Sequence, residues 1–227
     1  MVEGDRPIVL VTGGTGYLGR ALCEVLLARG ASVRVLVRPG GEPRAPRGAV
    51  LHLGDALNPD SVTVAAQGCD TLVHLVGTPH PASWKQAEFE RVDRTSLFAS
   101  VDAARRAGIR HFVYVSVAHP APAMQGYIAI RTQCEQRILE AGLNATILRP
   151  WYVLGAGHRW PLILVPFYWL AERLGPTRAA ALRLGLVTHA QMLLALRWAV
   201  ETPHAEAGPR IVDVAGIRAI AAAGAEA

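Results

Sequence analysis

Residues 8–20 read IVLVTGGTGYLGR, and this stretch decides the fold. Four apolar residues at 8–11 predict a buried strand, and apolar residues at helical spacing begin again at Leu18. Between them lie Gly13, Gly16 and Gly19, which permit a tight turn, a close approach to phosphate and close packing of helix on strand. The start of the helix supplies unpaired N–H groups and the positive end of a dipole. We therefore predict a cradle for the phosphates of a dinucleotide.

The rest of the first two thirds of the chain repeats this alternation of strand and helix. Further strands are predicted at residues 32–37, 50–53, 71–76, 111–117 and 145–148. Such an alternation is typical of a parallel sheet with right-handed crossovers, whose ligands bind beyond the carboxyl ends of the strands. We therefore expect the strand ends at Gly13, Arg38, Asp55 and Gly77 to line one cleft.

The alternation loosens beyond Gly155. We expect an apolar, aromatic helix at residues 160–174, a second helix at 188–201, a last strand at 210–214 and a frayed Ala-rich end from residue 220. The predicted organisation is therefore a dinucleotide-binding core at residues 1–155. Residues 156–227 form a small region on the substrate side that completes the same domain.

The end of the second predicted strand indicates which nucleotide is bound. A carboxylate at this place is typical of an NAD site, whereas an arginine accommodates the 2′-phosphate of NADP. Arg38 stands there, Arg44 and Arg47 are nearby, and the first acid is Glu42. We predict NADP, with NAD as the alternative; a solvated basic loop is the other interpretation.

Composition excludes several classes of function. The 227 residues are 51% hydrophobic and carry a net charge of +5, but the arginines are scattered, so we expect no nucleic-acid binding. The longest apolar run, residues 161–171, is too short to span a bilayer, and the first seven residues lack an apolar signal core, so we expect a cytoplasmic protein. The three cysteines, Cys23, Cys69 and Cys134, lack metal-ligand spacing, so no metal site is expected. A small-molecule substrate is expected, and a homo-oligomer is left open.

Four sequence pieces in order carry a family resemblance: TGGTGYLG at residues 12–19, Gly54-Asp55, VYVS at 113–116, and LRP at 148–150 with Gly155 after it. From about residue 8 to 157 the chain resembles the short-chain dehydrogenase/reductase superfamily. It is most similar to the atypical or extended branch that includes sugar-nucleotide epimerases and nitrogen-metabolite-repressor-like proteins. The resemblance implies a doubly wound α/β Rossmann fold with a small C-terminal helical appendage.

The resemblance also implies a set of cofactor-binding residues. They are Gly13, Thr15, Gly16, Tyr17, Leu18, Gly19, Arg38, Asp55, Ala56, Val76, Gly77, Arg131 and Pro150.

In this superfamily a serine after the fifth strand, a tyrosine and a lysine four residues beyond it form the active site. Ser116 and Tyr127 fall on the first two positions, but Arg131 stands where the lysine would be, and Lys85, the only lysine, lies far upstream. A guanidinium can bind ribose hydroxyls and lower the pKa of a neighbouring tyrosine by its charge, but it relays protons poorly. We predict Ser116, Tyr127 and Arg131 as the catalytic residues. A packing tyrosine and a solvated arginine are the alternative.

Three aromatic residues beyond the sixth strand, Trp151, Tyr152 and Trp160, are candidates to line an apolar substrate pocket. Core packing beneath the C-terminal helices is an equally favoured role for them.

Three functions are carried forward. The first is an NADP-dependent short-chain reductase acting on a carbonyl of a small, fairly apolar substrate. The second is a non-catalytic nucleotide sensor or assembly subunit, suggested by the arginine at position 131. The third is a sugar-nucleotide epimerase or dehydratase, which ranks last because the chain lacks a carboxylate at the end of the second strand and a long C-terminal substrate region.

Overall fold

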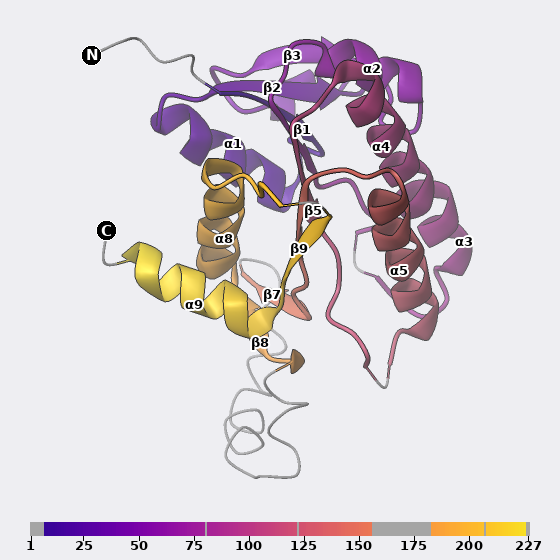
Figure 1. Cartoon of the computed structure of the whole chain (residues 1–227). Coiled ribbons are helices and arrows are strands. Elements are labelled where there is room, and N and C mark those ends of the chain that lie inside the picture. Colours follow the sequence, from indigo (N-terminus) through magenta and orange to yellow (C-terminus); the bar gives the residue numbers. More distant parts are fainter. Residues whose placement is uncertain (1–6, 80, 122, 156–182, 207, 226–227) are drawn as a thin grey trace.

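The computed structural model describes residues 7–79, 81–121, 123–155, 183–206 and 208–225. Within them, seven parallel strands form one sheet in the order β3-β2-β1-β4-β5-β6-β9 (Figure 1). The strands are β1 (Ile8–Thr12), β2 (Ser32–Val37), β3 (Val50–Leu53), β4 (Thr71–His74), β5 (His111–Val115), β6 (Ala145–Leu148) and β9 (Pro209–Val212). The strand order reverses between β1 and β4, which is where ligands bind in doubly wound sheets. The predicted fold class is confirmed.

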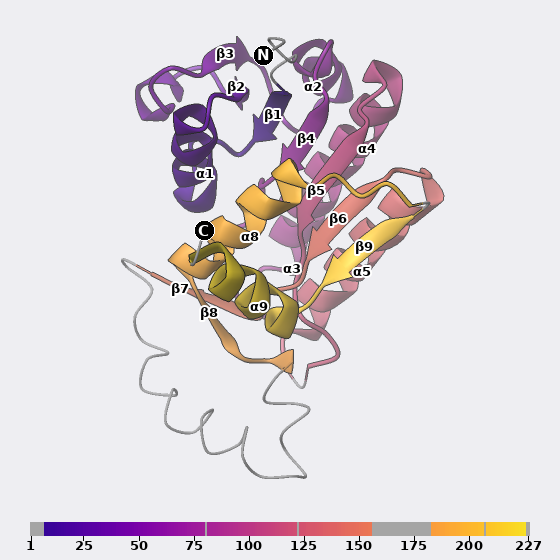
Figure 2. The same ribbon diagram turned by 60° about the vertical axis from the view of Figure 1, so that its left-hand side comes forward.

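Helices cover both faces of the sheet (Figures 1 and 2). One face carries α1 (Tyr17–Ala28), α8 (His189–Glu201) and α9 (Val214–Ala225). The other carries α2 (Pro59–Ala66), α4 (Thr95–Ala107) and α5 (Gln125–Glu140). The central strands are therefore buried on both sides, which explains their near-continuous apolar sequences.

Alternate residues of each strand enter different cores. Leu10 and Phe112 belong to the cluster under α2, α4 and α5, whereas Val9, Val11 and Val113 belong to the cluster under α1, α8 and α9. All five side chains are fully buried. This follows from the two-residue period of a strand, whose side chains point alternately to opposite faces.

The segment between β4 and β5 is more divided than the sequence suggests. Residues 82–107 predict either one long helix or a loop followed by a helix. The structure has α3 (Gln86–Glu88), the π-helical η2 (Phe89–Arg94) and α4 there. The strand expected at 71–76 ends at His74, so Val76 and Gly77 lie in the following loop.

The C-terminal part corrects one expectation and adds one element. Residues 220–225 are not frayed but belong to α9, whose Ile217 and Ala221 are buried. A second, two-stranded parallel sheet pairs β7 (Tyr152–Leu154) with β8 (Leu186–Thr188). The helix expected at residues 160–174 lies outside the described residues.

Two further sequence expectations concern membranes and cysteines. None of the helices in the described ranges is long and apolar enough to cross a membrane. Cys23, Cys69 and Cys134 are free and buried. Burial raises the pKa of the Cys23 thiol to about 12 and that of Cys134 to about 11, so both thiols stay protonated at neutral pH.

Candidate active site

The turn between β1 and α1 is built so that only glycine fits. Gly13 has φ +80°, and a Cβ there would lie 2.7 Å from the carbonyl carbon of Leu75, the residue just after the neighbouring strand β4. A Cβ on Gly19 would lie 2.3 Å from the carbonyl oxygen of Gly13. Gly16 is the N-cap of α1, and no side chain caps the helix there. The turn therefore leaves room at the positive end of the helix dipole, as a phosphate cradle requires.

A cavity of about 470 Å³ runs from this turn along the carboxyl ends of the strands. Its lining includes Gly13, Arg38, Asp55 and Gly77, so the prediction that these four strand ends share one cleft is confirmed. Thr15, Gly16, Ala56 and Val76, also predicted to bind cofactor, line it too. The lining residues that the sequence reasoning did not name as binding residues are Leu36, Arg44, Gly54, Leu57, Leu75, Pro79, Glu88, Arg91 and Val92.

A smaller cavity of about 190 Å³ opens beside the glycine turn. Thr15 and the loop after β2 line it, and Arg38 and Arg44 provide its two cationic side chains. Arg44 ends the 3₁₀ helix η1 (Glu42–Arg44), whereas Arg47 lies on the lining of neither this cavity nor the larger one. With two guanidinium groups and no carboxylate on its lining, the cavity is suited to an anionic group.

Ser116 follows β5 and is only 4% exposed. Its backbone N–H donates to the carbonyl of Leu148 at 2.8 Å, which ties this position to β6. Its Oγ is buried and has no hydrogen-bond partner among the described residues. Because buried hydroxyls are normally satisfied, this Oγ is a candidate for binding a ligand, although Ser116 does not line the 470 Å³ cavity.

Tyr127 lies in the first turn of α5 and is partly buried. Its ring packs against Phe89 of η2, with ring centres 4.9 Å apart, and the guanidinium carbon of Arg131 lies 4.9 Å from its ring centre. Burial raises the pKa of the Tyr127 hydroxyl, the charge of Arg131 opposes that rise, and the charge of Asp93 adds to it. The net direction is upward because burial dominates, although Arg131 itself lowers this pKa, as a guanidinium beside a tyrosine was expected to do.

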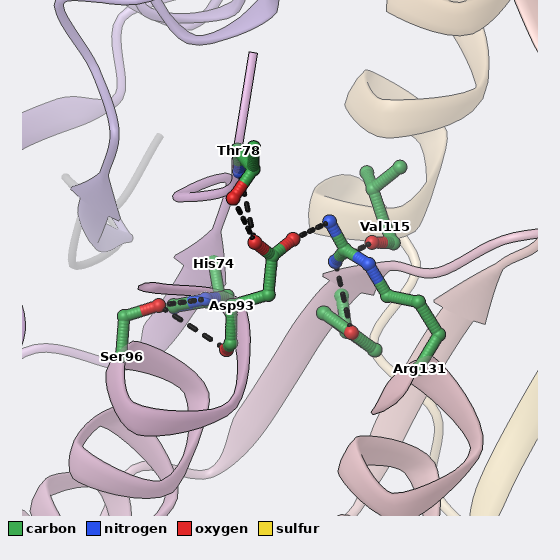
Figure 3. Close-up of polar contacts among 7 residues, drawn as sticks. His74, Thr78, Asp93, Ser96, Val115 and Arg131 are labelled. Carbon is green, nitrogen blue, oxygen red and sulfur yellow. Dashed lines mark hydrogen bonds and ion pairs between the residues drawn. The ribbon is translucent and has the colours of Figure 1, made fainter. Parts of the chain in front are cut away.

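Arg131 is buried beneath the cleft and makes its contacts with the protein (Figure 3). Nη1 donates to the Tyr114 hydroxyl at 2.9 Å and to the Val115 carbonyl at 3.0 Å, and Nη2 donates to Asp93 Oδ1 at 2.6 Å. Arg131 does not line the cofactor-sized cavity, but a Cβ on Gly77, which does, would lie 2.8 Å from Nη2. Arg131 therefore supports the cleft floor from below, and the interpretation as a solvated charge is wrong.

Asp93 is the main residue that the sequence reasoning missed. It is 1% exposed, and its Oδ2 accepts hydrogen bonds from the backbone N–H of Thr78 at 3.0 Å and from the Thr78 hydroxyl at 2.6 Å. Its ion pair with Arg131 joins η2 to α5, and its hydrogen bonds with Thr78 attach the loop after β4 (Figure 3). Its spacing in the sequence could have identified it. Asp93 lies four residues from both Phe89 and Leu97 and shares their buried face, where an unpaired carboxylate would be costly.

His74 at the end of β4 belongs to a second buried polar group. Its Nδ1 lies 3.0 Å from the Thr12 hydroxyl and 2.9 Å from the Ser100 hydroxyl, and its Nε2 lies 3.4 Å from Ser96 Oγ (His74 and Ser96 in Figure 3). Burial, aided by the charge of Arg131, lowers its pKa to about 3. His74 is therefore neutral and braces β1 and β4 against α4.

The other predicted site residues lie around the cleft but not on the lining of the larger cavity. Tyr17 packs on the His189 ring with centres 4.3 Å apart, Leu18 packs against the core under α1, and Gly19 is buried. The Pro150 carbonyl accepts a hydrogen bond from Ala118 N–H at 2.9 Å.

Of the predicted pocket aromatics, Trp151 packs against two apolar clusters, Tyr152 begins β7, and Trp160 lies outside the described residues. No metal-binding group of His, Cys, Asp and Glu is found among the described residues.

A separate cavity has a volume of about 590 Å³, and its first lining residue along the chain is Ala118, two residues beyond Ser116. Its lining residues are Ala118, His119, Arg149, Arg183, Ile211, Asp213 and Ala215. Arg149 is held by an ion pair with Glu135, in which Nε donates to Oε1 at 3.0 Å. This cavity therefore lies at the carboxyl ends of β5, β6 and β9. In the sheet, these strands are separated from β1 and its glycine turn by β4.

Comparisons with known proteins agree with this geometry. The profile of a family described as NAD(P)H-binding matches residues 13–157. The chain is 35% identical over 170 residues to a 4-hydroxy-2-methyl-3-oxo-4-farnesyl-3,4-dihydroquinoline-1-oxide ketoreductase of Stigmatella aurantiaca, covering 64% of this chain and 50% of that protein. It is 32% identical over 161 residues to a ceramide reductase of Caulobacter vibrioides, covering 69% of this chain and 50% of that protein. The chain thus spans about half the length of these curated relatives.

A solved structure with a similar fold is the Bordetella bronchiseptica enzyme WbmH in complex with NAD⁺. The TM-score is 0.69 at 18% identity, and the match covers 92% of this chain and 76% of that one. At this identity the likeness is one of fold.

Proposed function

Since this chain belongs to the NAD(P)H-binding family, with a Rossmann fold of the short-chain dehydrogenase/reductase type, we propose that it is an NADP-dependent reductase acting on a carbonyl of a small, fairly apolar substrate. The observation that carries this proposal is the continuous lining of the 470 Å³ cavity, which links the glycine turn to Arg38 and Arg44. Reductase names among its relatives support the same reaction class.

The residues present fit a bound dinucleotide phosphate. The turn at Gly13 and Gly16 lies at the start of α1, where backbone N–H groups and the helix dipole favour the pyrophosphate. Arg38 and Arg44 would hold the 2′-phosphate by charge-assisted hydrogen bonds. Gly77 would let the nicotinamide end pass over the Asp93–Arg131 pair.

A bound NADPH would supply the hydride that reduces the carbonyl carbon. Tyr127 would transfer its hydroxyl proton to the carbonyl oxygen, which becomes the oxygen of the product alcohol, and the tyrosinate would regain a proton from water. Ser116 would donate its unpartnered hydroxyl to the same oxygen and so fix the substrate. The raised pKa of Tyr127 keeps it protonated at neutral pH, as a proton donor must be.

The apolar character of the substrate rests on the surroundings of Tyr127. Val117, Ala121 and Ile128 form a small buried cluster against which Tyr127, Trp151 and Leu184 pack. Arg183, beside Leu184, lines the 590 Å³ cavity. We propose that this side of the molecule, with residues 156–227, receives the substrate.

The test is oxidation of NADPH, followed by absorbance, against a panel of ketones and quinones. On a substrate that is turned over, Tyr127→Phe should lower kcat by about 100-fold or more, because general acid catalysis contributes factors of this size. NADPH affinity, measured by thermal shift, is the control and should be unchanged. Full activity in Tyr127→Phe would show that another group donates the proton.

A second candidate is a non-catalytic nucleotide sensor or assembly subunit. One observation favours it: Arg131 is engaged by Asp93, Tyr114 and Val115 and is not exposed to the cleft. This function predicts tight dinucleotide binding without turnover of any carbonyl in the panel. The same panel therefore separates the two candidates.

A further inference from the structure

We propose that Asp93 is a positioning residue that binds Arg131 into a neutral pair beneath Tyr127, and thereby makes the Tyr127 hydroxyl harder to ionise. The proposal rests on the proposed role of Tyr127 in catalysis. It assigns a function to the one departure from the superfamily pattern, the arginine at position 131.

The first step is the geometry of the pair. Arg131 Nη2 and Asp93 Oδ1 are 2.6 Å apart, and the two side chains are 8% and 0% exposed. In the described structure Nη1 is shared by Tyr114 and Val115, while Nε has no partner among the described residues. The guanidinium is therefore held by the protein, and its charge is compensated within the fold.

Both members of the ion pair lie close to Tyr127, Arg131 by direct contact and Asp93 on the same element as Phe89. Arg131 lies one helical turn beyond Tyr127 on α5, with its guanidinium carbon 4.9 Å from the Tyr127 ring centre. Asp93 lies four residues beyond Phe89 on η2, and Phe89 packs directly on the Tyr127 ring. Single-turn π segments such as η2 recur at functional sites. Tyr127 therefore lies where η2 packs against α5, the two elements that the ion pair joins.

The third step concerns the other ionisable groups around Tyr127. Tyr114 comes from β5 and Cys134 from α5, and burial raises the pKa of both above the neutral range. They are therefore uncharged at neutral pH. Arg131 and Asp93 are the charges that act on Tyr127 at close range, with opposite signs.

The consequence is a division of roles within the pair. An uncompensated guanidinium beside Tyr127 would favour the tyrosinate, whereas a compensated one leaves burial to dominate and favours the neutral phenol. The neutral phenol is the form that gives a proton to a carbonyl oxygen. Asp93 thus acts on Tyr127 in two ways: it compensates the charge of Arg131, and its own negative charge opposes formation of the tyrosinate.

The experiment is a pH titration of tyrosinate by ultraviolet difference absorbance in the full-length protein without substrate or nucleotide. In each background, the signal of Tyr127 is obtained by subtracting the matching Tyr127→Phe variant. Asp93→Asn should increase the ionisation constant of Tyr127 about tenfold, a shift of about one pH unit downward. Arg131→Met should shift it in the opposite direction, and Asp93→Asn/Arg131→Met should return it toward the wild-type value.

A purely structural ion pair would not shift the Tyr127 ionisation midpoint in opposite directions in the two single variants. Should Asp93→Asn fail to fold because it leaves a buried charge unpaired, Arg131→Met is compared with the double variant. Asp93 then still accepts both hydrogen bonds from Thr78, and its lone charge should hold the Tyr127 midpoint above that of the double variant. Equal midpoints in that comparison, or shifts of the same sign in the single variants, would overturn the proposal. Because the titration needs no turnover, its outcome is independent of whether the protein reduces carbonyls.

Discussion

Arg38 and Arg44 reach the same small cavity from different segments, one from the end of β2 and the other from η1. Sequence reasoning placed Arg38 by its position after a strand, and it could name Arg44 and Arg47 only as neighbours. The fold separates the last two, because η1 turns Arg44 toward the glycine turn while Arg47 is exposed and lines neither the 190 Å³ nor the 470 Å³ cavity.

The prediction at this scale concerns nucleotide selectivity. Arg38→Ala and Arg44→Ala should each weaken NADPH binding by about 10- to 100-fold, since a charge-assisted contact contributes about 1.5–3 kcal/mol. NADH binding, which lacks the 2′-phosphate, should change little. Isothermal calorimetry with both nucleotides measures this, and Arg47→Ala is the matched control that should leave both affinities unchanged. Equal losses for NADPH and NADH would refute the 2′-phosphate role.

At the scale of elements, packing of α1 on β1 overrides helix propensity at Gly19. Alanine is the better helix former by about 1 kcal/mol, so propensity alone favours Gly19→Ala. In the fold, a Cβ at this position would lie 2.3 Å from the Gly13 carbonyl oxygen and 2.8 Å from Gly14 Cα. Both are backbone atoms that can move only if the helix shifts away from the phosphate turn.

We therefore expect Gly19→Ala to lower the free energy of unfolding by about 1–3 kcal/mol, the usual cost of overpacking, and to weaken dinucleotide binding. Urea denaturation and thermal shift with NADPH are the measurements. Gly224→Ala in α9 is the control. A Cβ there would have as its nearest neighbour Nη2 of Arg197, 3.3 Å away at the end of a flexible side chain. That variant should be neutral or stabilising. A stabilised Gly19→Ala would show that the turn can yield.

At the scale of the whole molecule, two buried histidines make stability depend on pH. Burial, with the charges of Arg210 and His204, lowers the pKa of His111 to about 4, and burial lowers that of His74 to about 3. Both folded-state values lie below the unfolded one. The unfolded chain therefore takes up these protons first, and the stabilisation present above about pH 6.5 is lost as the pH falls through the folded-state values.

The free energy of unfolding should therefore decrease as the pH falls from about 6.5 toward 4. His111→Gln should reduce this total decrease by about 3 kcal/mol at most, because it removes one of the two titrating groups. Urea unfolding at a series of pH values tests this. Above about pH 7, where both histidines are neutral, the two proteins should show the same pH slope. An unchanged slope between pH 6.5 and 4 would exclude His111 as a source of the acid sensitivity.

The sequence by itself determined the fold and the cleft. β2, β3 and β6 have the predicted bounds, and the strand ends Gly13, Arg38, Asp55 and Gly77 meet on one cavity. These features depend on local patterns, namely apolar runs, glycine spacing and the rule that parallel strands present their carboxyl ends at one edge. Where the local pattern was weak, as in η2, β7 and β8, the prediction failed.

Only the tertiary structure decided how the charge at position 131 is used. The spacing of four between Tyr127 and Arg131 predicts one helical face, but Asp93 lies 38 residues away from Arg131 in sequence and on another element. The fold brings them together because η2 packs against α5 and the loop after β4 fixes Asp93 through Thr78. Partners of a buried charge are chosen by proximity in space, and the unpartnered hydroxyl of Ser116 could likewise be identified only once its surroundings were known.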